Sequence, residues 1–234
     1  MSVKRPGGEI ANRPLHFIWI CDVSGSMAGD KIASLNHAIE ECIPHMVKVA
    51  SENAEAQVLV RAIKFSNGAN WHITDPTRVE EFKWSELKAD GVTDLGTALS
   101  MVADQLKIPP MTERALPPVL VLISDGQPTD DYKKGLKMLM EQPWGKKAVR
   151  VAIAMGADAD LDVLQQFIGQ VEIKPLQANN PEQLVNYIKW ASTAVLKAAS
   201  APPSVAKEQN TTSNVPLPPP PVDVTSLTDA EEVW

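Results

Sequence analysis

Oxygen-bearing side chains follow three segments of the chain at positions that suit a metal ion. Asp22, Ser24 and Ser26 alternate directly after an apolar run. Thr93 stands just before a segment of helical periodicity, and Asp125 follows an aliphatic run. All five are hard oxygen donors, which suit Mg²⁺, Mn²⁺ or Ca²⁺ and disfavour zinc or copper. The residues therefore predict a compact site for a divalent cation.

The balance of donors in this predicted site suggests what the ion would do. Three of the five side chains are neutral hydroxyls, so they leave the cation with residual positive charge. Such an ion attracts a carboxylate from another molecule into a coordination position that water otherwise fills. We expect a binding device, in which the ion captures an Asp or Glu of a protein partner.

The rest of the chain predicts the scaffold that would position these residues. Apolar runs of strand length alternate with segments of helical periodicity, which is typical of an α/β fold: a doubly wound, mostly parallel sheet with helices on both faces. Strands are expected at 15–21, 57–65, 119–123, 149–155 and 171–176, with an edge strand at 71–74 and with 15–21 and 119–123 as the central strands. Helices are expected at 32–49, 95–106, 132–140, 161–167 and 181–195. The last should be opened by Asn180 as N-cap, with Pro181 at the first helical position. Ligands bind at the carboxyl ends of the central strands of such sheets, so the three loops should meet there.

The same residue types also occur in ordinary turns and helix caps. Asp22 or Ser24 would then cap the helix that begins near Asp30. However, D-x-S-x-S follows a buried strand, and a G-x-T and a strand-terminal D-G come later in the matching order. This combination favours the metal site over capping.

Five polar residues beside the second and third loops are expected to serve their helices. Thr129, Asp130 and Asp131 should cap the helix that follows the third loop. Thr97 should bond back to the backbone of its own helix. Asp94 should interact favourably with the helix dipole as an acid in the first turn. The alternative is that it supports the metal ligands without binding the ion itself.

The spacing of the five metal-site residues resembles a known motif. Asp22, Ser24 and Ser26 with the distant Thr93 and Asp125 match the metal-ion-dependent adhesion site (MIDAS) of von Willebrand factor type A domains. The segments CDVSGSM, GVTDLGTAL and LISDGQPTDD are most similar to the bacterial tellurite-resistance-associated TerY type. The resemblance covers about residues 14–199 and implies a Rossmann-like sheet of six strands with one antiparallel edge.

The resemblance also implies the ion and the partners. It implies Mg²⁺, with Ser24, Ser26 and Thr93 as direct ligands, Thr93 in a ligand-bound state, and with Asp22 and Asp125 acting directly or through water. Proteins of the TerY type are thought to scaffold a protein kinase and a PP2C-type phosphatase in stress responses. We therefore expect a non-enzymatic, metal-dependent adaptor in a bacterial phospho-signalling or stress-response system.

Two other functions fit the sequence less well. A Mg²⁺-dependent phosphatase or phosphotransferase would use Asp22 as its nucleophile. Such enzymes place a second acid two residues later as general acid, and that position is Ser24 here. Nucleotide binding without a metal is disfavoured because the chain contains neither G-x-G-x-x-G nor G-x-x-x-x-G-K-[ST].

Composition excludes further classes of function. The chain has 22 Lys and Arg against 29 Asp and Glu, a net charge of -7, and no basic cluster, so a nucleic-acid partner is not expected. It has neither an apolar stretch long enough to span a bilayer nor the apolar core of a signal peptide near its start. Cys21 and Cys42 lie in apolar segments outside paired spacings, which indicates buried thiols in a reducing cytoplasm.

Domain organisation is predicted from a change in composition near residue 200. Residues 1–13 are expected to be a flexible N-terminus, 14–199 the folded domain and 200–234 a proline-rich acidic tail without a fold of its own. The tail carries 7 of the 19 prolines, and residues 217–221 favour polyproline II. The alternative for its acidic end is a short motif that orders on a partner, or a carboxylate that completes the metal shell.

Overall fold

A ten-residue strand at the centre of a six-stranded sheet organises the structure. The computed structural model describes residues 13–53, 56–125, 127–200 and 216–221. The strands are β1 (Arg13–Asp22), β2 (Ala56–Ser66), β3 (Gly68–Arg78), β4 (Val119–Ser124), β5 (Val149–Met155) and β6 (Leu176–Ala178), in the spatial order β3-β2-β1-β4-β5-β6. Only the edge strand β3 runs antiparallel to its neighbour. The predicted doubly wound sheet with one antiparallel edge is confirmed.

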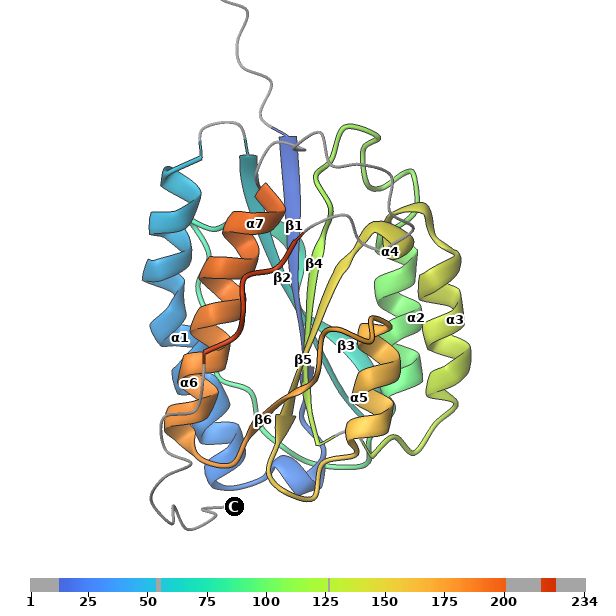
Figure 1. The fold of residues 1–234 in the computed structure, drawn as a ribbon. Helices are drawn as coiled ribbons and strands as arrows, with labels where there is room; N and C mark the ends of the chain where they lie inside the picture. The colour runs from blue at the N-terminus through green and yellow to red at the C-terminus, as the bar shows by residue number, and fades with distance from the viewer. Residues whose placement is uncertain (1–12, 54–55, 126, 201–215, 222–234) are drawn as a thin grey trace, which may run out of the picture.

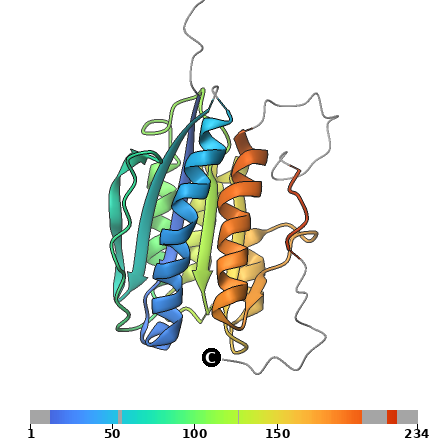
Figure 2. The ribbon, with the colours of Figure 1, turned by 90° about the vertical axis from the view of Figure 1, so that its left-hand side faces the viewer.

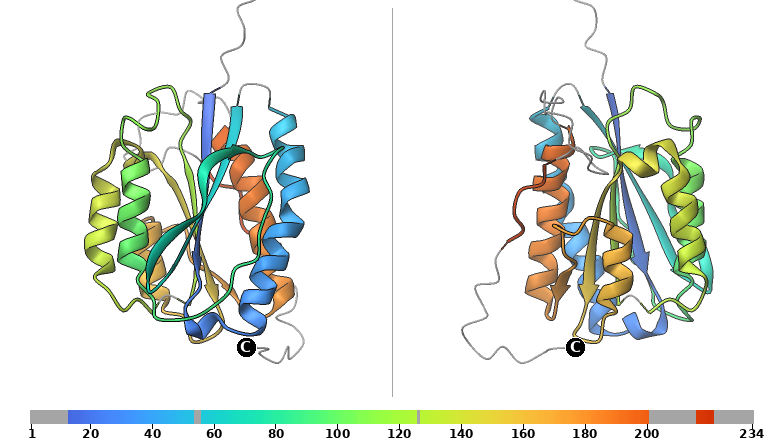
Figure 3. Two further views of the ribbon diagram at one scale, coloured as in Figure 1. Left: turned by 180° about the vertical axis from the view of Figure 1, so that it is seen from behind. Right: turned by 45° about the vertical axis from the view of Figure 1, so that its right-hand side comes forward.

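Helices cover both faces of this sheet (Figures 1 and 3). They are α1 (Asp30–Ser51), α2 (Leu95–Gln105), α3 (Tyr132–Glu141), α4 (Pro143–Lys147), α5 (Leu161–Ile168), α6 (Pro181–Trp190) and α7 (Leu196–Ser200). A 3₁₀ turn spans Gly25–Met27, and a π-helical turn at Ala191–Val195 joins α6 to α7. One face carries α1, α6 and α7, of which α1 and α6 lie side by side (Figure 2), and the other carries α2 to α5. Within the described ranges, no helix is both long and apolar enough to cross a bilayer.

Alternation along β1 divides the core into two parts. Phe17 and Trp19 point toward α1 and α6, whereas Ile18 and Ile20 belong to the cluster beneath α2 to α5. All four are essentially inaccessible to solvent, which explains why β1 reads as an almost continuous apolar run. β1 therefore lies in the middle of the sheet with both faces covered.

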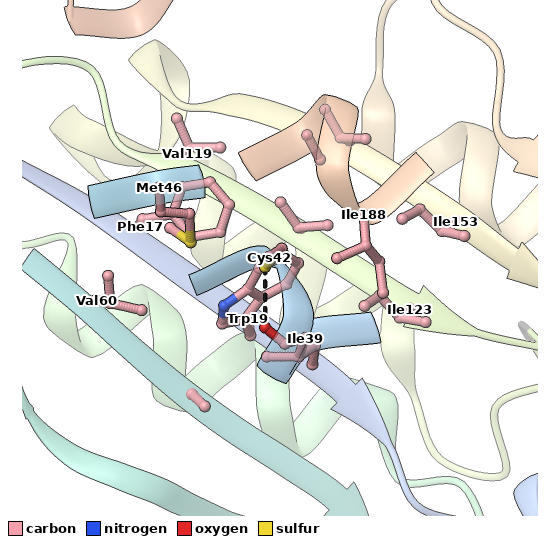
Figure 4. Packing of buried hydrophobic residues seen from close by; sticks show 14 of the residues in the cluster. Phe17, Trp19, Ile39, Cys42, Met46, Val60, Val119, Ile123, Ile153 and Ile188 are labelled. Carbon is pink, nitrogen blue, oxygen red and sulfur yellow. Dashed lines mark hydrogen bonds between the residues drawn. The ribbon is translucent and has the colours of Figure 1, made fainter. Parts of the chain in front are cut away.

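Cys42 packs in the part of the core that lies between α1 and the sheet. Its thiol donates to the carbonyl of Ile39 at 3.0 Å and lies near Trp19 (Figure 4). Ser192 in the π-helical turn donates to the Cys42 sulfur at 3.3 Å and to the carbonyl of Ile188 at 2.5 Å. Burial raises the pKa of the Cys42 thiol to about 12, so the side chain acts as a neutral packing group. Cys21 is also a buried free thiol, as expected.

The last strand differs from its prediction. Residues 171–176 were expected to form it, but β6 is Leu176–Ala178. Pro175 has no backbone N–H to donate to a ladder, and Val171 is 77% exposed, so pairing with β5 begins only after the proline. Residues 1–12 of the expected flexible N-terminus and most of the tail 200–234 lie outside the described residues, whereas Arg13 begins β1 and donates to the carbonyls of Arg114 and Ala115.

Helices α2 and α3 approach each other through glycine. A Cβ atom on Gly135 of α3 would lie 2.2 Å from the carbonyl oxygen of Gly96 on α2. A Cβ atom on Gly96 would lie 2.5 Å from the carbonyl oxygen of Asp131. Only hydrogen at these two positions lets the helices meet at this distance, which fixes where the N-terminus of α2 lies.

We predict that Gly135→Ala lowers the free energy of unfolding by about 1 to 3 kcal/mol, because the added methyl group must push α3 away from α2. Urea unfolding of the two proteins measures the difference. In an open helix the same change is stabilising by roughly 1 kcal/mol. A stabilised variant would therefore contradict the close approach of the helices.

Candidate metal centre

The carboxyl ends of β1 and β4 place two side chains together at the middle of the sheet. The strands are parallel neighbours with Cys21 opposite Ile123, so the next residues, Asp22 and Ser124, also lie across from each other. The Ser124 hydroxyl donates to Oδ2 of Asp22 at 2.5 Å. The backbone N–H of Ser24 donates to Oδ1 at 2.8 Å. Both oxygens of a completely buried carboxylate are thereby held in place.

The electrostatics of Asp22 are unfavourable to its charged form. Burial raises the pKa of Asp22 to about 6, and the negative charge of Asp125 adds to this, although hydrogen bonds from Ser124 and Ser24 act in the opposite direction. No Lys, Arg or His forms an ion pair with Asp22 or Asp125 in the part of the chain that the structure describes. Two nearby carboxylates without a cation form an electrostatically incomplete site.

The second loop is tied to the first by backbone hydrogen bonds. Gly25 donates to the carbonyl of Gly91 at 2.9 Å, and Asp90 donates to the carbonyl of Val23 at 2.8 Å. These bonds place Thr93, which is 5% exposed, on the same side of the sheet as the first loop. Its hydroxyl makes no hydrogen bond to any described residue, so the oxygen is free to coordinate an ion.

A single asparagine on α1 holds the long connection that leads to Thr93. The Oδ1 of Asn36 accepts from the backbone N–H of Leu87 at 2.8 Å and from the indole N–H of Trp84 at 3.0 Å. Its Nδ2 donates to the carbonyl of Leu87 at 3.0 Å. The Asn36 amide thus donates to and accepts from the backbone of Leu87 as a neighbouring strand would. It fixes residues 84–87, which belong to no helix or strand, against α1.

The third loop is tied to the second by Thr129. Its hydroxyl accepts from the backbone N–H of Thr93 at 3.1 Å, and its own N–H donates to the carbonyl of Thr93 at 2.8 Å. The same hydroxyl donates to Oδ1 of Asp94 at 3.1 Å, while Oδ2 of Asp94 accepts from Gly68 N–H at 2.7 Å. Asp94 therefore links the third loop, through Thr129, to Gly68 at the start of β3.

Two expectations for the neighbouring residues were wrong. Asp130 caps α2 rather than its own helix, because its carboxylate accepts from the N–H groups of Gly96 and Thr97, each at 2.8 Å. Thr97 does not bond back to its helix, since its hydroxyl donates to Asp130 at 3.1 Å. Asp131 alone caps α3, by accepting from Lys134 N–H. The N-terminus of α2 is thus fixed by a residue of the third loop.

All three predicted loops meet at the edge of the sheet where β1 and β4 end, the lower edge in Figure 1. Asp22, Ser24, Thr93 and Asp125 are buried, and Ser26 is exposed. The hydroxyls of Ser24 and Ser26 lie 3.0 Å apart, so the donors lead from the interior to solvent. One side of the site is therefore open to an approaching molecule.

The sequence prediction missed Ser124. It was counted only as the first residue of the third loop and was given no role, although a hydroxyl immediately before the predicted ligand Asp125 was a usable signal. Its contact with Asp22 links the first and third loops directly. Together with the bonds described above, each of the three loops is tied to the other two.

The chemistry of these donors fits a hard divalent cation. No group of three or more His, Cys, Asp or Glu side chains gathers anywhere among the described residues, so an ion here would need hydroxyl ligands beside its two carboxylates. That donor set suits Mg²⁺, Mn²⁺ or Ca²⁺.

The same geometry is poorly suited to phosphoryl transfer. A nucleophile must reach its substrate, but Asp22 is inaccessible to solvent and both of its oxygens accept hydrogen bonds. The neighbouring position where a general acid is expected holds Ser24.

Comparison with protein families supports the resemblance seen in the motif. Residues 17–127 match the family model of the von Willebrand factor type A domain, a segment that contains all five predicted ligands. Von Willebrand factor type A domains are generally interaction modules rather than enzymes, and many depend on a metal. No curated protein matches the chain in sequence.

Solved structures share the fold at low sequence identity. The ArnB paralog VWA2 from Sulfolobus acidocaldarius matches with a TM-score of 0.57 and 18% identity over 77% of this chain and 45% of that chain. A von Willebrand factor type A structure from Catenulispora acidiphila matches with a TM-score of 0.59 and 14% identity over 80% and 43%. Proximal thread matrix protein 1 from the mussel byssus, with a zinc-occupied MIDAS motif, matches with a TM-score of 0.58 and 14% identity over 80% of this chain and 47% of that chain. This chain spans less than half the length of each.

We predict that Asp22→Asn stabilises the metal-free protein at neutral pH. The folded state binds the Asp22 proton more tightly than the unfolded chain, so the wild-type free energy of unfolding falls as the pH rises from about 4 to about 6. The variant keeps an acceptor for the Ser24 N–H but has no carboxylate to ionise, so its free energy of unfolding does not fall in this pH range. Urea unfolding in chelator should give Asp22→Asn a free energy of unfolding higher than that of the wild type by on the order of 3 kcal/mol at pH 7, and nearly equal to it at pH 4.

Asp158→Asn is the control for this prediction, because it neutralises an exposed carboxylate on the loop that follows β5. It should leave the stability unchanged at both pH values. If Asp22→Asn instead destabilises the protein equally at pH 4 and pH 7, the Asp22 carboxylate acts only as a hydrogen-bonding group, and its charge does not destabilise the folded state.

Proposed function

We propose that the protein is a non-enzymatic, metal-dependent protein-binding module. A divalent cation, Mg²⁺ in the first place, is held by Asp22, Ser24, Ser26, Thr93 and Asp125. The ion supplies a positively charged coordination position, and an Asp or Glu of a partner protein completes its shell. The protein contributes orientation, exclusion of water on the buried side and a solvent-facing opening near Ser26.

The buried Asp22 carboxylate is the observation that carries this proposal. It lies at the end of a central strand, faces the charge of Asp125 and has no cationic partner among the described residues. A divalent cation would neutralise both carboxylates, and the free hydroxyl of Thr93 would add a neutral ligand. The hydrogen bonds from Ser24 and Ser124 tie the loops together, but they leave the charge of the buried carboxylate without a compensating cation.

The partner's chemistry follows from the ligand set. A dication bound by two carboxylates and three neutral hydroxyls has no excess negative charge around it, so an additional anionic ligand is acceptable. The resemblance to the TerY type adds the class of partner. We extend the proposal to an adaptor that joins a protein kinase and a PP2C-type phosphatase in a bacterial stress response, acting in the cytoplasm.

The mussel byssus structure with zinc in its MIDAS motif bears on the choice of ion. Imidazole and thiolate ligands favour zinc, and this site has neither. Its oxygen donors support Mg²⁺ or Mn²⁺ as the working ion in preference to zinc.

A capture experiment with immobilised full-length protein tests the function. Partners from a lysate of the host cells should bind in Mg²⁺ and be released by chelator, because their carboxylate is held by the ion. Asp125→Asn should weaken capture at least about tenfold, the scale on which loss of a group that supports a metal reduces its affinity. Asp158→Asn should capture the same proteins as the wild type.

Mass spectrometry of the eluted proteins identifies the partner, and an acidic surface residue on it should be required for binding. Capture that persists in chelator and in Asp125→Asn would contradict a metal-dependent interaction. Phosphatase turnover that depends on Asp22 would contradict a purely binding role.

A further inference from the structure

A proline-rich segment of the tail lies against helix α6. Residues 216–221 contain five prolines and Leu217, and they run alongside the helix (Figures 1 and 2). The indole N–H of Trp190, at the end of α6, donates to the carbonyl of Pro219 at 3.1 Å. Leu217 is half-buried and packs against the core cluster that includes α6. Six residues of the tail therefore have a defined place on the body.

The chemistry of this contact is that of polyproline recognition. Proline has no backbone N–H, so the five prolines of the segment present carbonyl acceptors only, and the indole of Trp190 is a donor only. Successive prolines fix an extended conformation before binding, which lowers the entropy lost on docking. Aromatic-lined surfaces that read proline-rich ligands combine these two features with a pocket for an apolar side chain. Leu217 supplies that side chain here.

The core cluster against which Leu217 packs has other half-buried apolar members. Val185 on α6 and Leu176 on β6 are half-buried members of the same cluster as Trp190 and Leu217. Half-buried apolar groups at the edge of a core gain stabilisation when a further apolar side chain covers them. The segment therefore covers apolar surface and also satisfies a polar donor.

We propose that the surface of α6 around Trp190 is a polyproline-binding site, which the chain fills with its own residues 216–221. The segment acts as a strap across α6. Because the ligand is tethered, its effective concentration at the site is in the millimolar range. A foreign proline-rich segment must outcompete it. The site uses none of the proposed metal ligands and is independent of the proposed function.

The indole N–H signal of Trp190 in the full chain reports directly on this contact. In a ¹H–¹⁵N spectrum, Trp190→Phe assigns the signal. Leu217→Asp should undock the strap, shift the Trp190 signal and speed its hydrogen exchange at least about tenfold, because the bond to Pro219 is lost. The indole of Trp19, buried in the core, should not move and reports that the fold is intact.

Leu217→Ala repeats the test with a smaller change and must shift the same signal in the same direction. An unchanged Trp190 signal in both variants would overturn the proposal. A Trp190 signal in the wild type that depends on protein concentration would place the segment on a second copy and overturn the arrangement within one chain.

A peptide of residues 211–222 tests the chemistry of the site. Added to the Leu217→Asp chain, it should bind and return the Trp190 signal toward its wild-type position. The wild-type chain should bind the peptide at least about tenfold more weakly, since its site is filled. The control is the same peptide carrying Leu217→Asp, which should not bind. Equal binding of the peptide to both chains, or to neither, would overturn the proposal.

Discussion

The buried negative charge of Asp22 is the interaction on which the rest of the site depends. The carboxylate ends a central strand of the sheet, where water cannot solvate it and where Asp125 repels it. Hydrogen bonds from Ser124 and from the backbone of Ser24 hold it in one orientation without neutralising it. The surrounding loops hold this group of oxygen-bearing side chains in the arrangement that the proposed cation requires.

The sequence was sufficient for the parts that depend on local pattern. The apolar runs at 15–21 and 119–123 identified β1 and β4 as central, because only a strand covered on both faces lacks polar alternation. Parallel neighbours must end at the same edge, so the D-x-S-x-S loop and Asp125 were expected to be close. Asn180 as the N-cap of α6, with Pro181 at its first position, follows from equally local rules and is observed.

Contacts between distant segments could not be read from the sequence. Thr129 and Asp130 have the composition of a helix cap, and nothing local indicates that they serve Thr93 and the N-terminus of α2. The strap at 216–221 was expected to be extended, but not to dock, because its docking depends on Trp190 and on apolar surface that only the folded body creates. In both cases the missing information is tertiary.

Calorimetric titration of the full chain with Mg²⁺ at pH 6 and pH 8, each in two buffers of different ionisation enthalpy, tests the central claim most directly. The account predicts one-site binding that releases about half a proton at pH 6, as Asp22 ionises to hold the ion, and almost none at pH 8. Asp22→Asn should abolish the proton release and weaken binding. No saturable binding at millimolar Mg²⁺, or binding that Asp22→Asn leaves unchanged, would contradict it.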